Sequence, residues 1–479
     1  MKKLPKDTSK IISYIMNKMN NNPDLIIKKL NFNSNQIAII FNENMVSSKT
    51  INDFILEPLT ENNINKKIDN ILEYLKTYIP TTKMIEINNY EDLITYLLNG
   101  YTIILIDNYS VCLGIETKNI LDSGISPAEN EKTLKGPKDA FTENYQTNIG
   151  LIRKRLKYEN LKLFNKSIGT IGKSMVGVMY IEEITNKKLV NKIINKIDKI
   201  KIEAVFDVNQ IIEIISENEK NVIPNFLTTE RPDYAAMQLL EGKIVIILEN
   251  TPFVAIVPAF ITDFFHTPED MYNRPINASI NRLIRFIAFI LTILTPALYI
   301  ALTTYNHETI PEDLIINLSI QRNGVPFSTI IEAILMILTF EILKETDLRT
   351  SSKIGSSLSI VGSLILGNAA VAAGIVSPIM VIIIAITAIS GLIVSHNDFI
   401  NGIRWWRIMF LIGASLAGVI GIVIVSLIFI TNLVSIKSFG YSFSYPFSPF
   451  NKKKMGNNII ISFYNRYFKH TSTSERKNI

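Results

Sequence analysis

The chain has 479 residues, of which 47% are hydrophobic, and it carries a formal net charge of +6. This length allows two or three domains, and the basic residues are interleaved with Asp, Glu and Asn, which argues against a nucleic-acid-binding surface. The single cysteine, Cys112, excludes an internal disulfide. The four histidines are far apart in the sequence and show no metal-ligand spacing, so we predict neither a metal nor another cofactor.

Charged residues are distributed unevenly along the chain. They alternate with apolar residues over the N-terminal part, but none occurs between Lys353 and Asp398 or between Arg407 and Lys437. Because a bilayer core requires about 20 apolar residues for each spanning helix, the sequence predicts a soluble N-terminal region followed by a polytopic helical transmembrane domain. No signal peptide is predicted, since the apolar stretch 11–16 is short, and the soluble region is therefore expected to be cytoplasmic.

The soluble region contains a weak internal duplication. Residues 97–108, LLNGYTIILIDN, match residues 239–250, LLEGKIVIILEN. Each copy is typical of a helix end, a glycine stop, a strand, an acidic-Asn turn and a second strand, which predicts a hairpin. A strand and an amphipathic helix precede each copy, at residues 36–56 and 176–200. We therefore predict two related α/β subdomains.

One segment of the second subdomain resembles a phosphate-binding loop. Residues 169–174, GTIGKS, end like a Walker A motif, but Ser167 stands where that motif requires Gly. The residues that follow are β-like, whereas a phosphate loop begins a helix, so a turn before a strand is the better interpretation. The sequence contains no nucleophile elbow and no His-Glu-x-x-His motif, and we predict that the protein is not an enzyme.

The first membrane helix is predicted at residues 286–302. Arg282 and Arg285 precede it and favour a cytoplasmic start. The loop at residues 303–322 is net acidic, as expected on the outer side.

A second apolar helix, residues 326–343, is predicted to carry Glu332 near its middle and Glu341 towards its end. Carboxylates at such depth are costly and usually functional, so both are pore or gating candidates. Their spacing directs them to opposite faces of a regular helix, so both cannot line one narrow pore. Glu341 is better interpreted as an interfacial residue beside Lys344, whereas a structural and a functional role remain equally open for Glu332.

The next charge-free run divides at residues 377–378 into two helices. The first is rich in small residues, which favours close helix packing, although a stripe of Ser and Asn side chains is also compatible with a pore in an oligomer. The second helix suits lipid contact. The further pore or gating candidates from the first helix are Gly362, Gly367, Asn368 and Val371.

The last apolar run, residues 408–436, is too long for one untilted helix and too short for two full spans. Five spans would leave the basic tail outside, against the positive-inside rule, whereas a broken or re-entrant last segment would return it to the cytoplasm. The total is therefore about four to six helices. The predicted domains are an N-terminal extension (1–34), subdomain 1 (35–123), a linker (124–157), subdomain 2 (158–281), a transmembrane helical domain (282–437) and a basic C-terminal tail (438–479).

Over roughly residues 35–450, the chain resembles the A subunits of spore germination receptors, the GerA family of the GerAA and GerKA type. The resemblance rests on several short sequence strings that occur in the same order. In the soluble region they are GP (136–137), FTEN (141–144), NIGLIRKR (148–155), TERPD (229–233), LEG (240–242) and TPF (251–253). In the membrane region they are VP (325–326), FE (340–341), IVG (360–362), GNAAV (367–371), AGIVSP (373–378) and SFG (438–440). Departures include Asn368 where the family has Gln, and a divergent tail after Pro449.

The resemblance implies a multi-pass protein of the inner spore membrane with a cytoplasmic N-terminal domain. It also implies that the protein acts with a transporter-like B subunit and a lipoprotein C subunit to sense nutrients. A further implication is that copies of the chain assemble into an ion-conducting pore. Our candidates for inter-subunit or coupling contacts are Arg153, Arg155, Glu230, Arg231 and Asp233. A structural alternative is that Arg231 and Asp233 pair and cap the helix that follows.

Two other functional classes remain open. A secondary transporter would need a site between broken helices, often in repeated membrane halves, and no membrane repeat is visible. A non-conducting scaffold would dock partners through its soluble domain, and it would tolerate replacement of Glu332.

Overall fold

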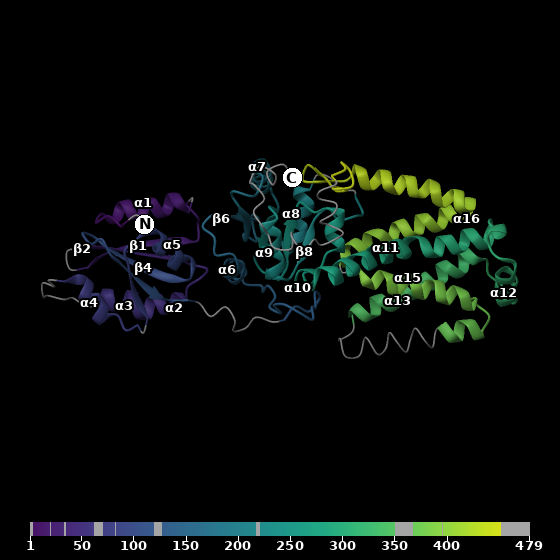
Figure 1. Ribbon diagram of the computed structural model, residues 1–479, viewed down its shortest axis with the longest axis horizontal. Coiled ribbons are helices and arrows are strands. Elements are labelled where there is room, and N and C mark those ends of the chain that lie inside the picture. Colours follow the sequence, from purple (N-terminus) through teal and green to yellow (C-terminus); the bar gives the residue numbers. More distant parts are fainter. Residues whose placement is uncertain are drawn as a thin grey trace. The chain divides into compact units, whose positions relative to one another are not determined.

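The computed structural model describes residues 3–19, 21–32, 35–61, 70–81, 83–118, 127–216, 221–349, 367–394 and 396–451. These residues form two compact units. The α/β unit comprises the described residues up to 216 together with 226–258, and the helical unit comprises 221–225 and 259–451 (Figure 1).

The first subdomain of the α/β unit is an antiparallel sheet covered by helices on both faces. Its strand order is β1-β2-β4-β5-β3. The strands are β1 (Leu25–Phe32), β2 (Asn35–Asn42), β3 (Met84–Ile87), β4 (Tyr101–Ile106) and β5 (Cys112–Glu116). The helices are α1 (Thr8–Lys18), α2 (Ser48–Ile51), the π-helical turn η1 (Asn52–Leu56), α3 (Glu57–Glu61), α4 (Ile71–Tyr78) and α5 (Tyr90–Leu98).

Alternation along the central strands builds two cores. Ile103 and Leu105 of β4 pack with α1 and α5, whereas Ile104 and Ile106 pack with α2 and α4, because successive strand side chains point to opposite faces. Residues 1–34, which we assigned to an extension, supply α1 and β1 to this subdomain, and β1 pairs with β2 along its whole length. The boundary after residue 34 is therefore not a domain boundary in the structure.

The second subdomain repeats this architecture with the strand order β6-β7-β9-β10-β8. Its strands are β6 (Leu161–Ile168), β7 (Ser174–Ile181), β8 (Leu227–Thr229), β9 (Ile244–Leu248) and β10 (Val254–Val257). Its helices are α6 (Tyr145–Arg155), α7 (Lys187–Asp198), α8 (Val208–Ile215) and α9 (Pro232–Leu240). The segment after residues 169–174 is the strand β7, as the sequence predicts for a turn rather than a phosphate loop.

Matching backbone conformations mark the same points of the two copies. Gly100 and Gly242, which end α5 and α9, have φ values of 80° and 89°. Asn108 and Asn250, in the turns between the paired strands, have φ values of 68° and 65°. Asn tolerates this left-handed region better than most residues, and Gly adopts it freely. The duplication predicted from these strings is therefore confirmed by the strand order and by the turns.

The helical unit is organised around α11 (Pro275–Thr304), which packs against α13, α15 and α16 (Figure 1). The other helices are α10 (Glu269–Tyr272), α12 (Glu312–Arg322), α13 (Thr329–Arg349), α15 (Pro378–Ile393) and α16 (Asn397–Ser435), and residues 367–372 are also helical. Short elements are η2 (Ile261–Phe265), η3 (His307–Thr309), β11 (Lys437–Ser438) and β12 (Tyr441–Ser442).

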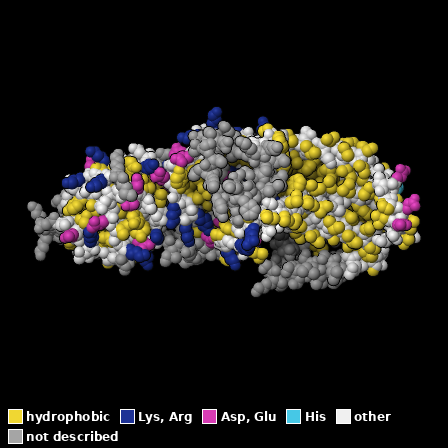
Figure 2. Space-filling view, in the orientation of Figure 1, with side chains coloured by type: hydrophobic (Ala, Val, Ile, Leu, Met, Phe, Trp, Pro, Cys, Tyr) yellow, Lys and Arg dark blue, Asp and Glu magenta, His cyan; other side chains and the backbone are white. Residues whose placement is uncertain are grey.

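Large apolar side chains are exposed over the surface of the helical unit. Figure 2 shows them as a nearly continuous apolar face, whereas charged side chains are scattered over the α/β unit. Examples are Leu392 at 68% exposed, Ile420 at 69% and Leu427 at 62%. Among the described residues, α11 and α16 are long and apolar enough to cross a membrane, and α15 is a shorter apolar helix. A surface of this kind marks a contact with lipid or protein.

The last apolar run is a helical hairpin. Ala417 and Gly418 have non-helical backbone angles within α16, and the rings of Trp406 and Phe429 lie 4.9 Å apart. In a straight helix these two residues would be separated by about 35 Å. The sequence left open whether this segment is one span or a broken one, and the structure shows that it turns back on itself.

Two details of the helical unit differ from the prediction. Residues 312–322 form the helix α12 within the predicted outer loop. The helix predicted from residue 326 begins at Thr329, and residues 325–328 before it are not helical. Glu332 therefore lies in the first turn of α13, and its prediction near the middle of the helix is wrong.

Candidate functional sites

Glu332 lies in a buried polar cluster between three helices. Its side chain is 0% exposed, and its Oε2 accepts hydrogen bonds from the backbone N–H and the hydroxyl of Ser377, both at 2.9 Å. Ser377 is the residue before the first turn of α15, so the carboxylate lies at a helix N-terminus, where negative charge is stabilised. The other oxygen, Oε1, is 3.7 Å from Nη2 of Arg322, at the end of α12.

This cluster contains two polar atoms without a hydrogen bond among the described residues. They are Oε1 of Glu332 and Nε of Arg322. Buried polar groups are usually paired, so these atoms are able to accept a change of partner among the helices or a bound water. The cluster therefore connects α12, α13 and α15 through one carboxylate that is only partly satisfied.

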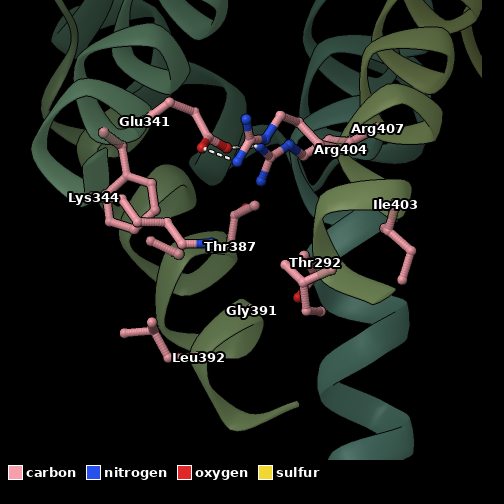
Figure 3. A pocket seen from close by; sticks show the side chains of 12 residues that line it. Thr292, Glu341, Lys344, Thr387, Gly391, Leu392, Ile403, Arg404 and Arg407 are labelled. Carbon is pink, nitrogen blue, oxygen red and sulfur yellow. Dashed lines mark hydrogen bonds and ion pairs between the residues drawn. The ribbon is translucent and has the colours of Figure 1, made fainter. Parts of the chain in front are cut away.

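Glu341 lies in a pocket at the other end of α13 and contacts α16 (Figure 3). Its Oε1 is 2.6 Å from Nη2 of Arg407, and its Oε2 is 3.0 Å from Nη2 of Arg404. Lys344 lines the same pocket, as do Thr292 of α11 and residues of α15. Arg407 directly precedes the last charge-free run, so Glu341 stays interpreted as an interfacial residue.

The small-residue helix is described only from residue 367 onwards. Gly367 is buried, and a Cβ placed on it would lie 3.5 Å from Cγ1 of Val381 of α15, an ordinary packing distance. Asn368 is exposed and Val371 is half-buried. Gly362 lies outside the described residues. Close packing thus accounts for Gly367, whereas the exposed amide of Asn368 stays a candidate for a contact beyond this chain.

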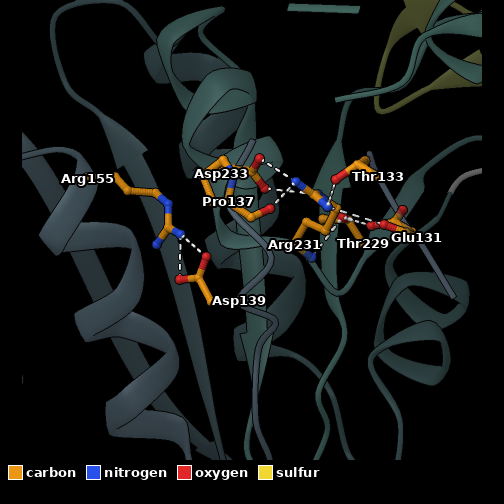
Figure 4. Close-up of polar contacts among 8 residues, drawn as sticks. All are labelled: Glu131, Thr133, Pro137, Asp139, Arg155, Thr229, Arg231 and Asp233. Carbon is orange, nitrogen blue, oxygen red and sulfur yellow. Dashed lines mark hydrogen bonds and ion pairs between the residues drawn. The ribbon is translucent and has the colours of Figure 1, made fainter. Parts of the chain in front are cut away.

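In the α/β unit, the TERPD segment holds the polypeptide that connects the two subdomains (Figure 4). The guanidinium of Arg231, 1% exposed, donates to both carboxylate oxygens of Asp233 at 3.1 and 2.7 Å. It also donates to the carbonyl of Pro137 at 2.8 Å, the hydroxyl of Thr133 at 2.7 Å and the carbonyl of Glu131 at 3.3 Å. We call residues 127–139 the connecting strap. Arg231 therefore fixes the strap along most of its length.

The neighbouring residue Glu230 completes this arrangement. Its Oε1 accepts hydrogen bonds from the backbone N–H groups of Asn130 and Glu131, both at 2.6 Å. The carboxylate of Glu131 accepts a hydrogen bond from the hydroxyl of Thr229. Burial is the main reason that the pKa of Glu131 rises to about 7, and the nearby charge of Glu230 adds to it.

The predicted pairing of Arg231 with Asp233 is thus observed, and Arg231 is the residue that precedes the first turn of α9, although its side chain does not cap that helix. The basic residues of α6 are also engaged within the α/β unit. Nε of Arg153, a side chain 3% exposed, is 2.6 Å from Oδ2 of Asp24. Nη2 of Arg155 is 2.5 Å from both oxygens of Asp139 in the strap.

All five residues proposed as coupling contacts therefore lie in intrachain networks. Their position suits a role in holding the strap and α6 in place rather than direct contact with another subunit.

Sequence reasoning missed Arg322 and Ser377 as partners of Glu332. A signal for Arg322 was present, since a carboxylate in an apolar segment needs a cation and Arg322 is the nearest basic residue before it in the sequence. No comparable signal identified Ser377, because Ser before Pro at a helix start has a sufficient local explanation.

Comparisons with known proteins extend along nearly the whole chain. The family model "Bacillus/Clostridium GerA spore germination protein" matches residues 13–472. Spore germination protein KA of Bacillus subtilis (strain 168) is 32% identical over 448 residues, which cover 93% of this chain and 82% of that protein. Spore germination protein GerQA of Bacillus cereus is 33% identical over 460 residues, which cover 96% and 91%.

Among solved structures, the N-terminal domain of the A subunit of the Bacillus megaterium spore germinant receptor GerK3 aligns with a TM-score of 0.42 and 28% identity, over 54% of this chain and 98% of that one. The family match and the two germination proteins carry the assignment, because each extends over most of this chain. The chain therefore belongs to the GerA family of spore germination proteins.

Proposed function

We propose that this chain is the A subunit of a nutrient-sensing spore germination receptor, and that copies of its helical unit assemble to form or gate an ion-conducting pore in the inner spore membrane. The observation that carries the membrane part is the exposed apolar surface of α11, α13, α15 and α16. Membership of the GerA family supports the proposed role in spore germination.

The proposed topology places one end of the helical unit in the cytoplasm. Lys344, Arg404 and Lys437 belong to that end, since Arg404 pairs with Glu341 beside Lys344, and the second limb of the hairpin ends before Lys437. The turn of the hairpin lies at the opposite end, where the backbone N–H of Val419 donates to Oδ1 of Asn306 at 3.2 Å. The acidic residues after Asn306 are then outside, and Lys344, Arg404 and Lys437 are inside, in agreement with the positive-inside rule.

This arrangement returns the basic tail to the cytoplasm, because both limbs of α16 cross the membrane. The α/β unit then lies on the same side, as proposed for a domain that receives a signal from partners. The partners that we propose are a transporter-like B subunit and a lipoprotein C subunit. Nutrient bound to a partner opens the pore only if it binds the open and closed assemblies with different affinity.

Glu332 is the proposed gating residue. Its carboxylate holds α15 through Ser377 and approaches α12 through Arg322, so a movement between these helices must break a buried, partly satisfied contact. Such a contact is able to favour one of two helix arrangements without making the other inaccessible. Asn368 is the proposed pore-facing residue, since it is a polar side chain exposed on a helix of the apolar unit.

The test is potassium efflux from vesicles that contain this chain with its B and C partners, with and without a panel of amino acids and sugars. Glu332→Gln keeps an acceptor for Ser377 but removes the charge that faces Arg322, so the nutrient response should shift. Glu308→Gln makes the same chemical change at an exposed outer position and should leave efflux unchanged.

Two outcomes would overturn the proposal. Vesicles that stay tight while the complex binds nutrient would support the non-conducting scaffold. Uptake of labelled nutrient by this chain without its partners would support a secondary transporter.

A further inference from the structure

The pocket around Glu341 carries an excess of positive charge. Among its lining residues, the cations are Lys344, Arg404 and Arg407, and the carboxylate of Glu341 is the single anion. Glu341 contacts one arginine with each of its oxygens, so a single carboxylate faces three cations in this pocket. Nε of Arg407, a side chain 7% exposed, has no hydrogen-bond partner within the described residues. A buried guanidinium with a free N–H, beside a half-buried lysine, is able to bind a further acceptor.

The geometry indicates which chemical group would satisfy these donors. Arg presents planar donors that match the oxygens of phosphate, and Lys adds a mobile point charge. Thr292 and Thr387 also line the pocket (Figure 3), but their hydroxyls donate to carbonyls of their own helices, so the donors for a ligand are the cations. A phosphate group would reduce the excess charge and accept hydrogen bonds from both cation types.

Apolar residues at the rim favour a lipid as the source of that phosphate. Leu392 lines the pocket and is 68% exposed, and Ile389, on the preceding turn of α15, is 61% exposed. Acyl chains attached to a bound headgroup would cover these side chains, whereas a free phosphate would leave them uncovered. Basic pockets between helices at the cytoplasmic end of a membrane domain are suited to anionic headgroups.

We propose that the pocket formed by Lys344, Arg404, Arg407 and Glu341 binds the phosphate group of an anionic membrane lipid. This inference rests on the proposed membrane placement of the helical unit. The bound lipid joins the end of α13 to the start of α16 and supplements the ion pairs of Glu341.

The experiment uses the full-length chain and native mass spectrometry with equal concentrations of phosphatidylglycerol and phosphatidylcholine. Wild type should retain phosphatidylglycerol preferentially. Lys344→Gln should weaken that retention about five-fold, the effect of one basic charge near a lipid surface. Lys344→Arg should restore it. Lys437→Gln, which removes an exposed charge at the same proposed end of the helices, should behave as wild type.

A second arm separates the two sources of phosphate. Inorganic phosphate is added to the protein in neutral detergent, and thermal unfolding is compared with chloride at equal ionic strength. Suppose that phosphate stabilises the wild-type protein, that Lys344→Gln abolishes this stabilisation, and that wild type shows no preference for phosphatidylglycerol. This result would show that free phosphate, and not a lipid, is the ligand. No preference and no stabilisation, or an equal loss in Lys437→Gln, would overturn the site itself.

Extraction with alkaline carbonate distinguishes this failure from failure of the membrane proposal. A chain that stays in the vesicles but shows no lipid preference contradicts only the lipid site. A chain that is released contradicts the membrane placement.

Discussion

The α/β unit and the helical unit bury charge in different ways. Arg231 directs its guanidinium to five acceptor oxygens, two of them on Asp233. Glu332, equally buried, has one oxygen with two hydrogen bonds and a second oxygen that only approaches Arg322 at 3.7 Å. A fully hydrogen-bonded charge fixes one conformation, whereas a partly satisfied charge can exchange partners at lower cost. The comparison is consistent with a structural role for the Arg231 network and with the gating role that we propose for Glu332.

The largest expected effect comes from breaking the satisfied network. Arg231→Ala would leave Asp233 buried without its cation and release the connecting strap, and it should lower the free energy of unfolding of the α/β unit by about 3–5 kcal/mol. Urea unfolding followed by pulse proteolysis of the full-length protein measures this value. Lys132→Ala, at an exposed position of the same strap, is the control. Equal loss in both variants would show that the strap is held by other contacts.

The corresponding change in the helical unit is Ser377→Ala. It removes the hydroxyl that donates to Glu332 while leaving the backbone N–H in place, so the expected loss is about 1.5–3 kcal/mol, typical of one hydrogen bond to a charge. Thermal unfolding in detergent measures it. Ser426→Ala removes a hydroxyl that donates only to a carbonyl of its own helix, that of Ile422 at 2.7 Å, and should cost less. Similar losses would mean that Glu332 contributes no special stability.

The two limbs of the α16 hairpin pack together without charged side chains, so they allow a test of close packing alone. A Cβ on Gly421 would lie 1.9 Å from the carbonyl oxygen of Gly413, so Gly421→Ala must separate the two limbs and should cost about 1–3 kcal/mol through overpacking. In the matched control, Gly391→Ala, the new Cβ would meet Cγ2 of Thr292 at 3.6 Å, and stability should be retained. Thermal unfolding of both variants decides the point, and an unchanged Gly421→Ala protein would mean that the limbs do not pack closely.

The smallest effect concerns the pH dependence of the strap. The pKa of Glu131 is raised from 4.5 to about 7 in the folded protein, so the folded state keeps a proton that the unfolded chain releases. The stabilisation that comes from this retained proton is fully present below about pH 4.5 and is lost as pH rises through about 7. Over this range the free energy of unfolding should fall by at most about 1.4 kcal/mol per pH unit. Pulse proteolysis across this range should show that slope, and Glu131→Gln should remove it. An identical slope in the variant would assign the effect to another group.

Much of the fold follows from local patterns. The repeated Gly and Asn positions predict the turns of both subdomains, because Gly100, Asn108 and their counterparts adopt left-handed angles that few other residues accept. The two cores on either face of the first sheet also have a local cause. Successive side chains of a strand point to opposite faces, and this direction depends only on the backbone. The start of α13 was less predictable, because apolar residues before Thr329 have the composition of the helix without being part of it.

Apart from the pairing of Arg231 with Asp233, the candidate sites were predicted only as isolated residues. Glu332, Glu341 and the TERPD segment could be chosen from the sequence because a carboxylate in an apolar run and a charged motif are visible without a structure. The partners Ser377 and Arg407 could not be chosen, since both are distant in the sequence and several other residues had the same chemistry.

The amino-acid sequence was sufficient to separate a charged region from a region with an apolar surface and to show that the α/β region is duplicated, because composition and periodicity are local properties. The folded structure was needed to show that the last apolar run turns back at Ala417 and Gly418, that Arg231 holds the strap and that one oxygen of Glu332 has no hydrogen bond within the described residues. These outcomes depend on which distant segments pack together, and that choice reflects the free energy of the whole fold rather than the preference of any one segment.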